Sequence, residues 1–200
     1  YIGTSSFSGC TNLTHIKMPT NIDNIPSSAF ARCKSLVSID IPESVKYIGS
    51  ATFSECSSLT TVTIPKSTEY IEIDTFYFCD SLISINVDPD NQKYCSKDGV
   101  WFDKAMTQLM QYPANSSRSD YTIPDTINTI AYRSFFNCKT LKNITIPKSV
   151  NSIGMFAFYD CTNLKNVYYK GSKADWEKIN ILDFNECLTN STRYYNYDPN

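Results

Sequence analysis

The residues of this chain best suited to chemistry are its eight cysteines and single histidine. Cysteine can act as a nucleophile beside histidine, bind zinc in C-x2-C pairs, or form disulfides. No C-x2-C pair occurs, so we expect no zinc site. The one Cys-His pair close in sequence, Cys10 and His15, is not expected to catalyse, because the periodicity described below buries the cysteine and turns the histidine outward.

Other chemical motifs are incomplete. The segment Asp88-Pro89-Asp90-Asn91 resembles the start of a calcium loop, but Lys93 and Gly99 stand where the turn glycine and the bidentate glutamate belong. We therefore predict a polar loop there. No phosphate-cradling glycine motif, G-x-S-x-G elbow or H-E-x-x-H helix occurs. The sequence thus predicts a protein that is not an enzyme and that holds no metal or cofactor.

Charge and hydrophobicity narrow the class of partner. The chain has 18 basic and 20 acidic residues, a net charge of -2, and no long block of either sign. A general binder of nucleic acid or of anionic membranes is therefore disfavoured. No apolar run approaches the roughly 20 residues that a membrane-spanning helix needs, so we expect no membrane insertion by this segment.

The cysteines recur in the sequence at a fixed interval of 23 residues. The series contains Cys10, Cys33, Cys56 and Cys79, and then Cys138 and Cys161. Aliphatic residues return three, six and eight places after each cysteine, as in Leu36, Ile39 and Ile41. The alternation of the last two predicts a strand with one buried face.

The rest of each repeat predicts turns. Proline closes the strand, as Pro42 does, and a second apolar pair follows, as in Val45 and Ile48. An aromatic residue stands twenty places after the cysteine, as Phe53 does. Glycines such as Gly49 follow the second apolar pair, where a tight corner favours a residue without Cβ.

One such repeat cannot bury its apolar positions alone, so the repeats must stack. Repeats of this length predict a leucine-rich-repeat solenoid: right-handed, with a curved parallel β-sheet and with short strands, turns and 3₁₀ segments on the outer side. We expect one solenoid domain over residues 1–190 with a C-terminal cap at about 168–200. Since the chain begins in the middle of a repeat, we expect it to be part of a longer protein.

One repeat is lengthened. The interval from Cys79 to Cys138 is 59 residues, after which the pattern resumes with Asn115 in the cysteine position. We predict a β-hairpin insertion at about 88–114, with Gln108 to Tyr112 as the partner strand of Val100-Trp101-Phe102.

The pattern C-x2-L-x2-I-x-I-P-x5-I-x3-A/T-F-x2-C, seen from Cys33 to Cys56, resembles the BspA-like, treponemal-type leucine-rich repeats. The resemblance covers most of the chain, with departures at Thr68, at Asn115 and in the lengthened repeat. The insertion and the ending with Trp176 look like variants common in surface proteins of gut bacteria. The resemblance implies an exported or cell-surface bacterial protein and adhesion to host proteins or other cells.

Equivalent cysteines on stacked repeats lie about 5 Å apart, but their Cβ atoms point in parallel. We therefore expect buried free thiols in the six periodic positions, acting as small hydrophobic groups. Cys95 and Cys187 lie outside this column, and the sequence leaves their state open.

The outward residues of the main strands stand five and seven places after each cysteine and form two columns of hydroxyl and amide groups. One column contains His15, Ser38, Thr61, Ser84, Asp120, Asn143 and Asn166, and the other contains Lys17, Asp40, Thr63, Asn86, Thr122, Thr145 and Tyr168. Such a face could hydrogen-bond a sugar or a polar protein surface, or could be an idle solvated sheet.

Aromatic residues in the insertion are the other candidates. Trp101, Phe102 and Tyr112 could form a protruding anchor for a partner, or could cover the solenoid core. For Trp176 we favour a capping role, because a solenoid must cover its last apolar layer.

The function predicted is a non-catalytic surface or secreted binding module, with a protein or glycan ligand on host or neighbouring cells. A carbohydrate-binding module and a passive spacer stay open as alternatives.

Overall fold

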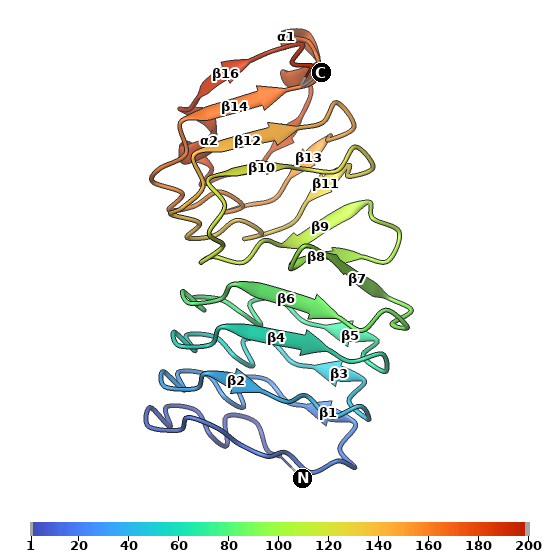
Figure 1. Cartoon of the computed structure of the whole chain (residues 1–200), viewed down its shortest axis with the longest axis vertical. Helices are drawn as coiled ribbons and strands as arrows, with labels where there is room; N and C mark the ends of the chain where they lie inside the picture. The colour runs from blue at the N-terminus through green and yellow to red at the C-terminus, as the bar shows by residue number, and fades with distance from the viewer. Residues whose placement is uncertain (1, 199–200) are drawn as a thin grey trace. The chain divides into compact units, whose positions relative to one another are not determined.

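A computed structural model describes residues 2–198 of the chain and contains two compact units, Tyr1–Lys104 and Ala105–Asn200. Both units are parallel β-solenoids built from 23-residue turns of the chain, as predicted. A single domain over residues 1–190 stays a prediction. In each unit one series of strands forms the front sheet, and a second series of shorter strands forms the back sheet (Figure 1).

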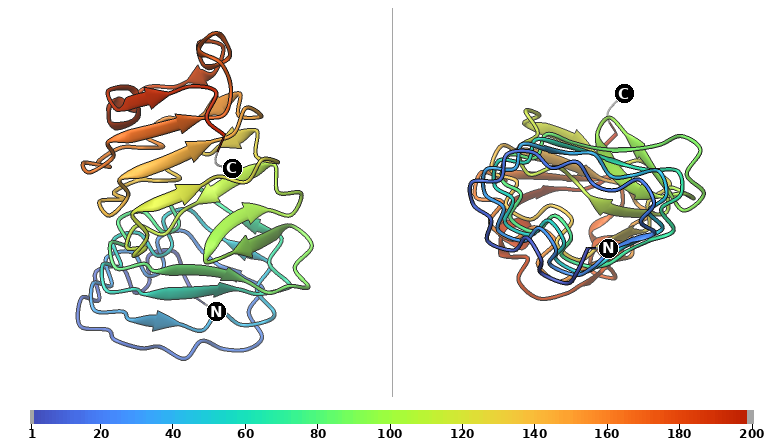
Figure 2. Two further views of the ribbon diagram at one scale, coloured as in Figure 1. Left: turned by 45° about the horizontal axis from the view of Figure 1, so that its top comes forward. Right: turned by 90° about the horizontal axis from the view of Figure 1, so that it is seen from below.

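The front sheet of unit 1 contains β2, β4 and β6, which are parallel and in a register of 23 residues: Ser38 pairs with Thr61, and Thr61 pairs with Ser84. The back sheet contains β1, β3 and β5. Their bounds are β1 Asn24–Ile25, β2 Ser38–Ile39, β3 Tyr47–Ile48, β4 Thr61–Ile64, β5 Tyr70–Ile71 and β6 Ser84–Val87. Seen from below, the coils of unit 1 lie one behind another (Figure 2).

Two local predictions differ from the structure. Residues 13–19 of the first repeat form no strand, since only part of this segment hydrogen-bonds to the next repeat, through the carbonyls of Thr11 and Thr14. The expected 3₁₀ segments do not occur among residues 2–198, where hydrogen-bonded turns and two-residue strands make the corners instead.

The core of unit 1 is a stack of identical side chains. Phe7, Phe30, Phe53 and Phe76 are stacked with ring centroids 5.2, 5.7 and 5.9 Å apart. The Leu, Ile and Val positions of the repeat are buried beside them, with Leu36, Leu59 and Leu82 fully enclosed. Stacked rings at this spacing bury large apolar areas and add a favourable ring–ring term.

A glycine is required at one corner of the repeat. A Cβ on Gly49 would lie 2.4 Å from the backbone nitrogen of Ser27, and one on Gly154 would lie 2.5 Å from that of Tyr132. No side chain fits at these separations. The predicted glycine corner is confirmed, and its cause is the close approach of the preceding repeat.

The insertion is a hairpin, but its strands differ from the prediction. Strands β7 (Tyr94–Lys97) and β8 (Val100–Asp103) pair antiparallel around the turn Asp98-Gly99, whose residues both have positive φ, as a type I′ turn requires. The predicted partner strand was wrong: Gln108–Gln111 forms β9, which pairs parallel with β11 in unit 2. The Asp-Gly dipeptide was the stronger hairpin signal.

Unit 2 repeats the architecture. Its front sheet has the order β10-β12-β14-β16, and its back sheet contains the parallel series β9, β11, β13 and β15. The bounds are β10 Asp120–Thr122, β11 Thr129–Ile130, β12 Asn143–Ile146, β13 Ser152–Ile153, β14 Asn166–Tyr169, β15 Asn180–Ile181 and β16 Thr192–Tyr194. Tyr112, Phe135 and Phe158 form its aromatic stack, with centroids 5.1 and 4.8 Å apart.

Two short helices lie in the last coil of unit 2, α1 (Lys173–Trp176) and α2 (Glu186–Thr189). Ser172 and Asp175 form a capping box at the start of α1, which positions the buried Trp176 ring edge-on to Tyr169, 5.3 Å between centroids. The Arg193 guanidinium lies 5.1 Å from the Trp176 ring on its other contact. These contacts support the capping role predicted for Trp176.

Buried asparagine side chains end the hydrogen-bond ladders. In unit 2 the Asn185 amide donates to the carbonyls of Gly154 and Leu182 at 2.9 and 2.7 Å, and its oxygen accepts from the Phe158 N–H at 2.9 Å. In earlier repeats the aromatic N–H donates to a backbone carbonyl of the next repeat, as Phe30 donates to Thr52. Asn185 therefore replaces the missing backbone of a further repeat.

The aromatic stack generates a stability prediction. Phe53→Ala leaves a cavity between Phe30 and Phe76, and we expect it to lower the free energy of unfolding by about 3–5 kcal/mol. Urea denaturation followed by circular dichroism measures the loss. The control is Ile83→Ala, at a side chain that is 50% exposed, for which a change within about 0.5 kcal/mol is expected. A loss below about 1 kcal/mol for Phe53→Ala would contradict a tightly packed stack.

Candidate functional site

The outward residues of the unit 1 front sheet form the first candidate surface. Alternation along β4 buries Val62 and Ile64 and exposes Thr61 and Thr63. The predicted columns are therefore accessible in this unit: His15, Lys17, Ser38, Asp40, Thr61, Thr63 and Asn86 are exposed, and Ser84 is half-buried. Ser84 donates to the Asn86 side-chain oxygen at 2.8 Å, so part of this polar face is already hydrogen-bonded to itself.

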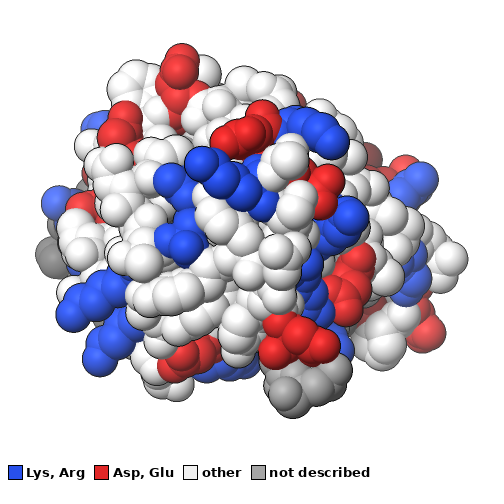
Figure 3. All heavy atoms as spheres, turned by 90° about the horizontal axis from the view of Figure 1, so that it is seen from above, with Lys and Arg blue, Asp and Glu red and all other residues white. Residues whose placement is uncertain are grey.

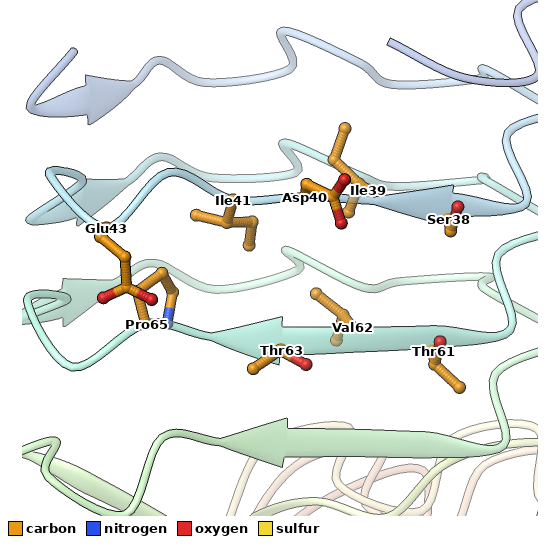
Figure 4. A pocket seen from close by; sticks show the side chains of 9 residues that line it. All are labelled: Ser38, Ile39, Asp40, Ile41, Glu43, Thr61, Val62, Thr63 and Pro65. Atoms are coloured by element: carbon orange, nitrogen blue, oxygen red, sulfur yellow. The ribbon is translucent and has the colours of Figure 1, made fainter. Parts of the chain in front are cut away.

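A shallow groove of about 210 Å³ opens on this face between β2 and β4 (Figure 4). It exists because β2 pairs with β4 over only two residues, whereas β4 and β6 pair over four. Beyond Ile39 the two chain segments carry no ladder, and the groove is lined there by Asp40, Glu43, Thr63 and Pro65. Its carboxylates and hydroxyl can accept hydrogen bonds from a polar ligand.

The front sheet of unit 2 carries an amide ladder. The Asn166 side-chain amide donates to the Asn143 oxygen at 2.8 Å, and the Asn143 amide donates to an Asp120 carboxylate oxygen at 2.5 Å. These residues stand opposite one another in the strand register. The ladder fixes the orientation of every amide, so its remaining acceptors and donors face outward in a defined pattern.

Asp120 is the charged end of this ladder. Hydrogen bonds donated by the Ser119 hydroxyl and then by the Asn143 amide hold the pKa of its carboxyl below the ordinary value. Since a carboxylate accepts stronger hydrogen bonds than a neutral acid, these donors favour the ionised form.

Beside the ladder lies an aromatic platform. The Tyr168 ring stacks on Tyr194 with centroids 5.1 Å apart and contacts Tyr197 at 4.6 Å. Tyr194 is 46% exposed. Thr145, next to Tyr168 in the register, is only 8% exposed, so the prediction that it faces solvent was wrong. Sequence alternation found Tyr168 but not Tyr194, because β16 lies outside the 23-residue spacing.

The aromatic residues of the insertion are buried. Trp101 is 5% exposed, Phe102 is enclosed, and Tyr112 is 2% exposed. Trp101 packs edge-on against Phe76 within unit 1, whereas Tyr112 occupies the aromatic position 23 residues before Phe135 in unit 2. Of the two interpretations from the sequence, burial supports the one in which these rings cover the core.

All eight cysteines are free thiols. In the column, each buried thiol donates to the carbonyl of the aromatic residue 26 places earlier, as Cys56 does to Phe30 at 3.2 Å and Cys79 to Phe53 at 3.1 Å. Burial raises the pKa of Cys33 to about 11 and that of Cys56 to about 12, and the neighbouring thiol adds to both shifts. These thiols remain protonated at neutral pH and are poor nucleophiles.

Two cysteines differ from the prediction. Cys10 is exposed rather than buried, in contrast to the equivalent Cys33 of the next repeat. Cys187 was placed outside the column, but it lines the same hollow as Cys161 and so continues the series. The spacing hid it, because the last coil contains three residues more than the others.

Catalytic and metal chemistry receive no support from the part of the chain that is described. Within residues 2–198, no three His, Cys, Asp or Glu side chains gather as metal ligands would, and no helix is long and apolar enough to cross a bilayer. Lys and Arg alternate with Asp and Glu on the face shown in Figure 3.

The turns of unit 2 carry exposed aromatic residues that sequence reasoning missed. Phe156 and Phe184 stack with centroids 4.3 Å apart, and Phe136 stacks on Tyr159 at 5.3 Å. They stand next to the periodic aromatic positions, as Phe136 follows Phe135. Doubled aromatic residues at this point of the repeat were the available signal.

Comparison with known families and structures follows the geometry. A family model described as a BspA type leucine rich repeat region matches residues 1–97 and 112–194 in six copies. A search of curated protein sequences gives no match. The resemblance drawn from the sequence is confirmed, and the unmatched gap falls on the hairpin and the start of unit 2.

Structures of bacterial leucine-rich-repeat proteins are similar to this one. A leucine-rich repeat protein from Eubacterium ventriosum is 26% identical with a TM-score of 0.66, covering 84% of this chain and 57% of its own. The pneumococcal vaccine antigen PcpA is 27% identical with a TM-score of 0.64, covering 73% of this chain and 42% of its own. The chain thus spans about half the length of these two relatives.

A leucine rich cell surface protein from Faecalibacterium prausnitzii shares the fold, with 21% identity and a TM-score of 0.63, covering 89% of this chain and 71% of its own.

The amide ladder predicts a titration effect. Asn143→Ala removes a donor to Asp120, and we expect the pKa of that carboxyl to rise toward its ordinary value. Carboxyl ¹³C NMR over pH 2–6 measures the shift. Asn163→Ala removes an amide that donates to the Lys139 carbonyl instead, and should leave Asp120 unchanged. An unmoved Asp120 titration in Asn143→Ala would contradict the ladder.

The thiol column predicts a pH dependence of stability. Thiols of the unfolded chain titrate near pH 9.0, whereas Cys33 and Cys56 in the folded chain titrate near about 11 and 12. Above pH 9 the unfolded state therefore loses protons that the folded state keeps. We expect the free energy of unfolding to fall as pH rises from about 9 to about 12.

Pulsed alkylation at pH 9 followed by mass spectrometry checks the same column. Cys10 should be modified in the native protein, and Cys33 and Cys56 only after denaturation in urea. Equal labelling of Cys10 and Cys56 in the native state would refute a buried column.

Proposed function

Because this chain belongs to the BspA-type leucine-rich-repeat family, we propose that it is a non-catalytic binding module, acting in adhesion or protein–protein interaction at a bacterial surface. The observation that carries the proposal is the front sheet of unit 2, where the fixed amides of Asn143 and Asn166 adjoin the Tyr168–Tyr194 platform. Oriented polar groups beside exposed aromatic rings are typical of protein recognition sites.

Preorganisation supports this proposal. Each amide of the ladder is held by its neighbour, and the Tyr168 ring is held between Tyr194 and Tyr197. A partner therefore need not immobilise these side chains on binding, which lowers the entropic cost of association. The front sheet of unit 1, with its groove at Asp40 and Thr63, offers a second polar surface of the same kind.

Location at the cell surface is part of the proposal. It rests on the family and on relatives described as a vaccine antigen and a cell surface protein. Fractionation of the source bacterium with an antibody to this chain tests it, and a signal confined to the cytoplasm would refute it.

A carbohydrate ligand is the second candidate, favoured by one observation. Tyr168 and Tyr194 present a tilted aromatic pair next to the Asn166 amide, the combination that packs against a sugar ring while hydrogen-bonding its hydroxyls. A glycan array probed with the purified chain tests this candidate. An array blank at millimolar ligand would eliminate it.

The binding prediction is tested first with the purified chain against a panel of host matrix proteins and whole cells, by surface plasmon resonance and flow cytometry. Saturable binding to at least one member is expected. For that member, Tyr194→Ala should weaken affinity by about tenfold or more, because it removes half of the exposed platform.

Tyr70→Ala is the matched control. Tyr70 is 57% exposed and stacks on Tyr47, but lies on the back sheet of unit 1. Unchanged affinity is expected. No saturable binding across a broad panel would favour a passive spacer, and equal losses in both variants would contradict a site on the front sheet.

A further inference from the structure

A second surface lies on unit 2, away from its front sheet. It is formed by the side chains of Phe136, Phe156, Tyr159, Leu182 and Phe184, here called the turn strip, which all come from turns between strands. The rings are continuous: Phe136 stacks on Tyr159, Tyr159 meets Phe156 edge-on at 5.6 Å, and Phe156 stacks on Phe184.

The strip is open to solvent at its C-terminal end. Tyr159 and Leu182 are each 43% exposed, and Phe184 is 46% exposed. Exposed large hydrophobic residues gathered on one patch mark an interaction surface more often than scattered ones do. Phe156 and Phe184 also have φ values of 59° and 63°, a left-handed backbone that bulky side chains rarely adopt.

The strip already binds one cation within the molecule. The Arg133 guanidinium lies 4.8 Å from the Tyr132 ring, 5.3 Å from Phe156 and 5.6 Å from Phe136. These distances are those of cation–π contacts, which guanidinium groups make most often. The faces of these rings are thus suited to a guanidinium, and Arg133 occupies only the end near Phe136.

The other end carries negative charge. Phe184 and Leu182 line a shallow hollow of about 380 Å³ together with Asp183 and Glu186, and no Lys or Arg lines it. Among residues 2–198, neither carboxylate lies within ion-pair distance of a basic side chain. Aromatic faces and free carboxylates around one hollow are complementary to a cationic side chain flanked by an apolar one.

We propose that the turn strip docks an extended segment of a partner protein in which arginine or lysine stands next to an aliphatic or aromatic residue. The cation enters the hollow between Phe184 and the carboxylates of Asp183 and Glu186, and the apolar neighbour covers Tyr159 and Phe156. This surface extends the proposed binding role and rests on it only in that the partner is a protein.

Phage display of random dodecapeptides on the purified full chain tests the proposal. Peptides in which Arg or Lys adjoins an apolar residue should be enriched. An enriched pool of acidic or uncharged peptides, or no enrichment, would overturn it.

Two variants locate the site with a synthetic peptide from the enriched pool, by fluorescence polarisation. Phe184→Ala should weaken binding by about tenfold, and the double variant Asp183→Asn/Glu186→Gln, which keeps the shape of the hollow, by several-fold. The effect of the double variant should shrink in 1 M NaCl, where charge is screened. Unchanged affinity in both variants would overturn the proposal.

Tyr194→Ala serves as the matched control and distinguishes the two surfaces. It alters the front sheet alone, so the cationic peptide should bind it with unchanged affinity. Loss of peptide binding in Tyr194→Ala but not in Phe184→Ala would place the peptide on the front sheet and overturn the turn-strip proposal. Near-ultraviolet circular dichroism of each variant checks that the fold is retained.

Discussion

The structure depends on one constraint: residues 23 apart must lie directly above one another, about one strand spacing away. Parallel pairing of Ser38 with Thr61 and of Asn143 with Asn166 expresses it on the front sheets. Because equivalent side chains are then direct neighbours, a position can be buried only if its equivalents are compatible. Phenylalanine stacks on phenylalanine, thiols follow thiols, and amides hydrogen-bond to amides.

The same constraint explains how the units end. A ladder of identical repeats leaves backbone groups unsatisfied wherever a repeat is missing, and a buried unpaired group is costly. Asn185 supplies both a donor and an acceptor where the last coil of unit 2 departs from the repeat. Asn91 does so in unit 1, donating to the carbonyls of Pro65 and Thr68 and accepting from the N–H groups of Lys93 and Tyr94. In both places a side-chain amide takes the part of a peptide group.

Periodicity made most of the fold predictable, and breaks in periodicity limited it. The strands, the proline bends, the glycine corner and the aromatic stack all follow from positions counted from a cysteine. The hairpin partner was wrong because Tyr94–Lys97 alternates too weakly to be recognised, although Asp98-Gly99 indicated the turn. Tyr194 and Cys187 were missed because the coil after Cys161 is three residues longer, which shifts every later position out of the count.

The turn strip shows why the candidate site was less predictable than the core. The place eighteen residues after each cysteine position has positive φ in every repeat, at Ser28, Ala51, Asp74, Arg133 and Phe156. Small and polar residues are common there because the side chain faces outward and a left-handed backbone costs a larger L-residue about 1–2 kcal/mol. Core packing does not require Phe156 in that place, and stacking on the equally strained Phe184 offsets the cost only in part. Exposure and backbone strain coincide on the same two rings, and folding accounts for neither, which is why the turn strip is assigned to recognition rather than to stability.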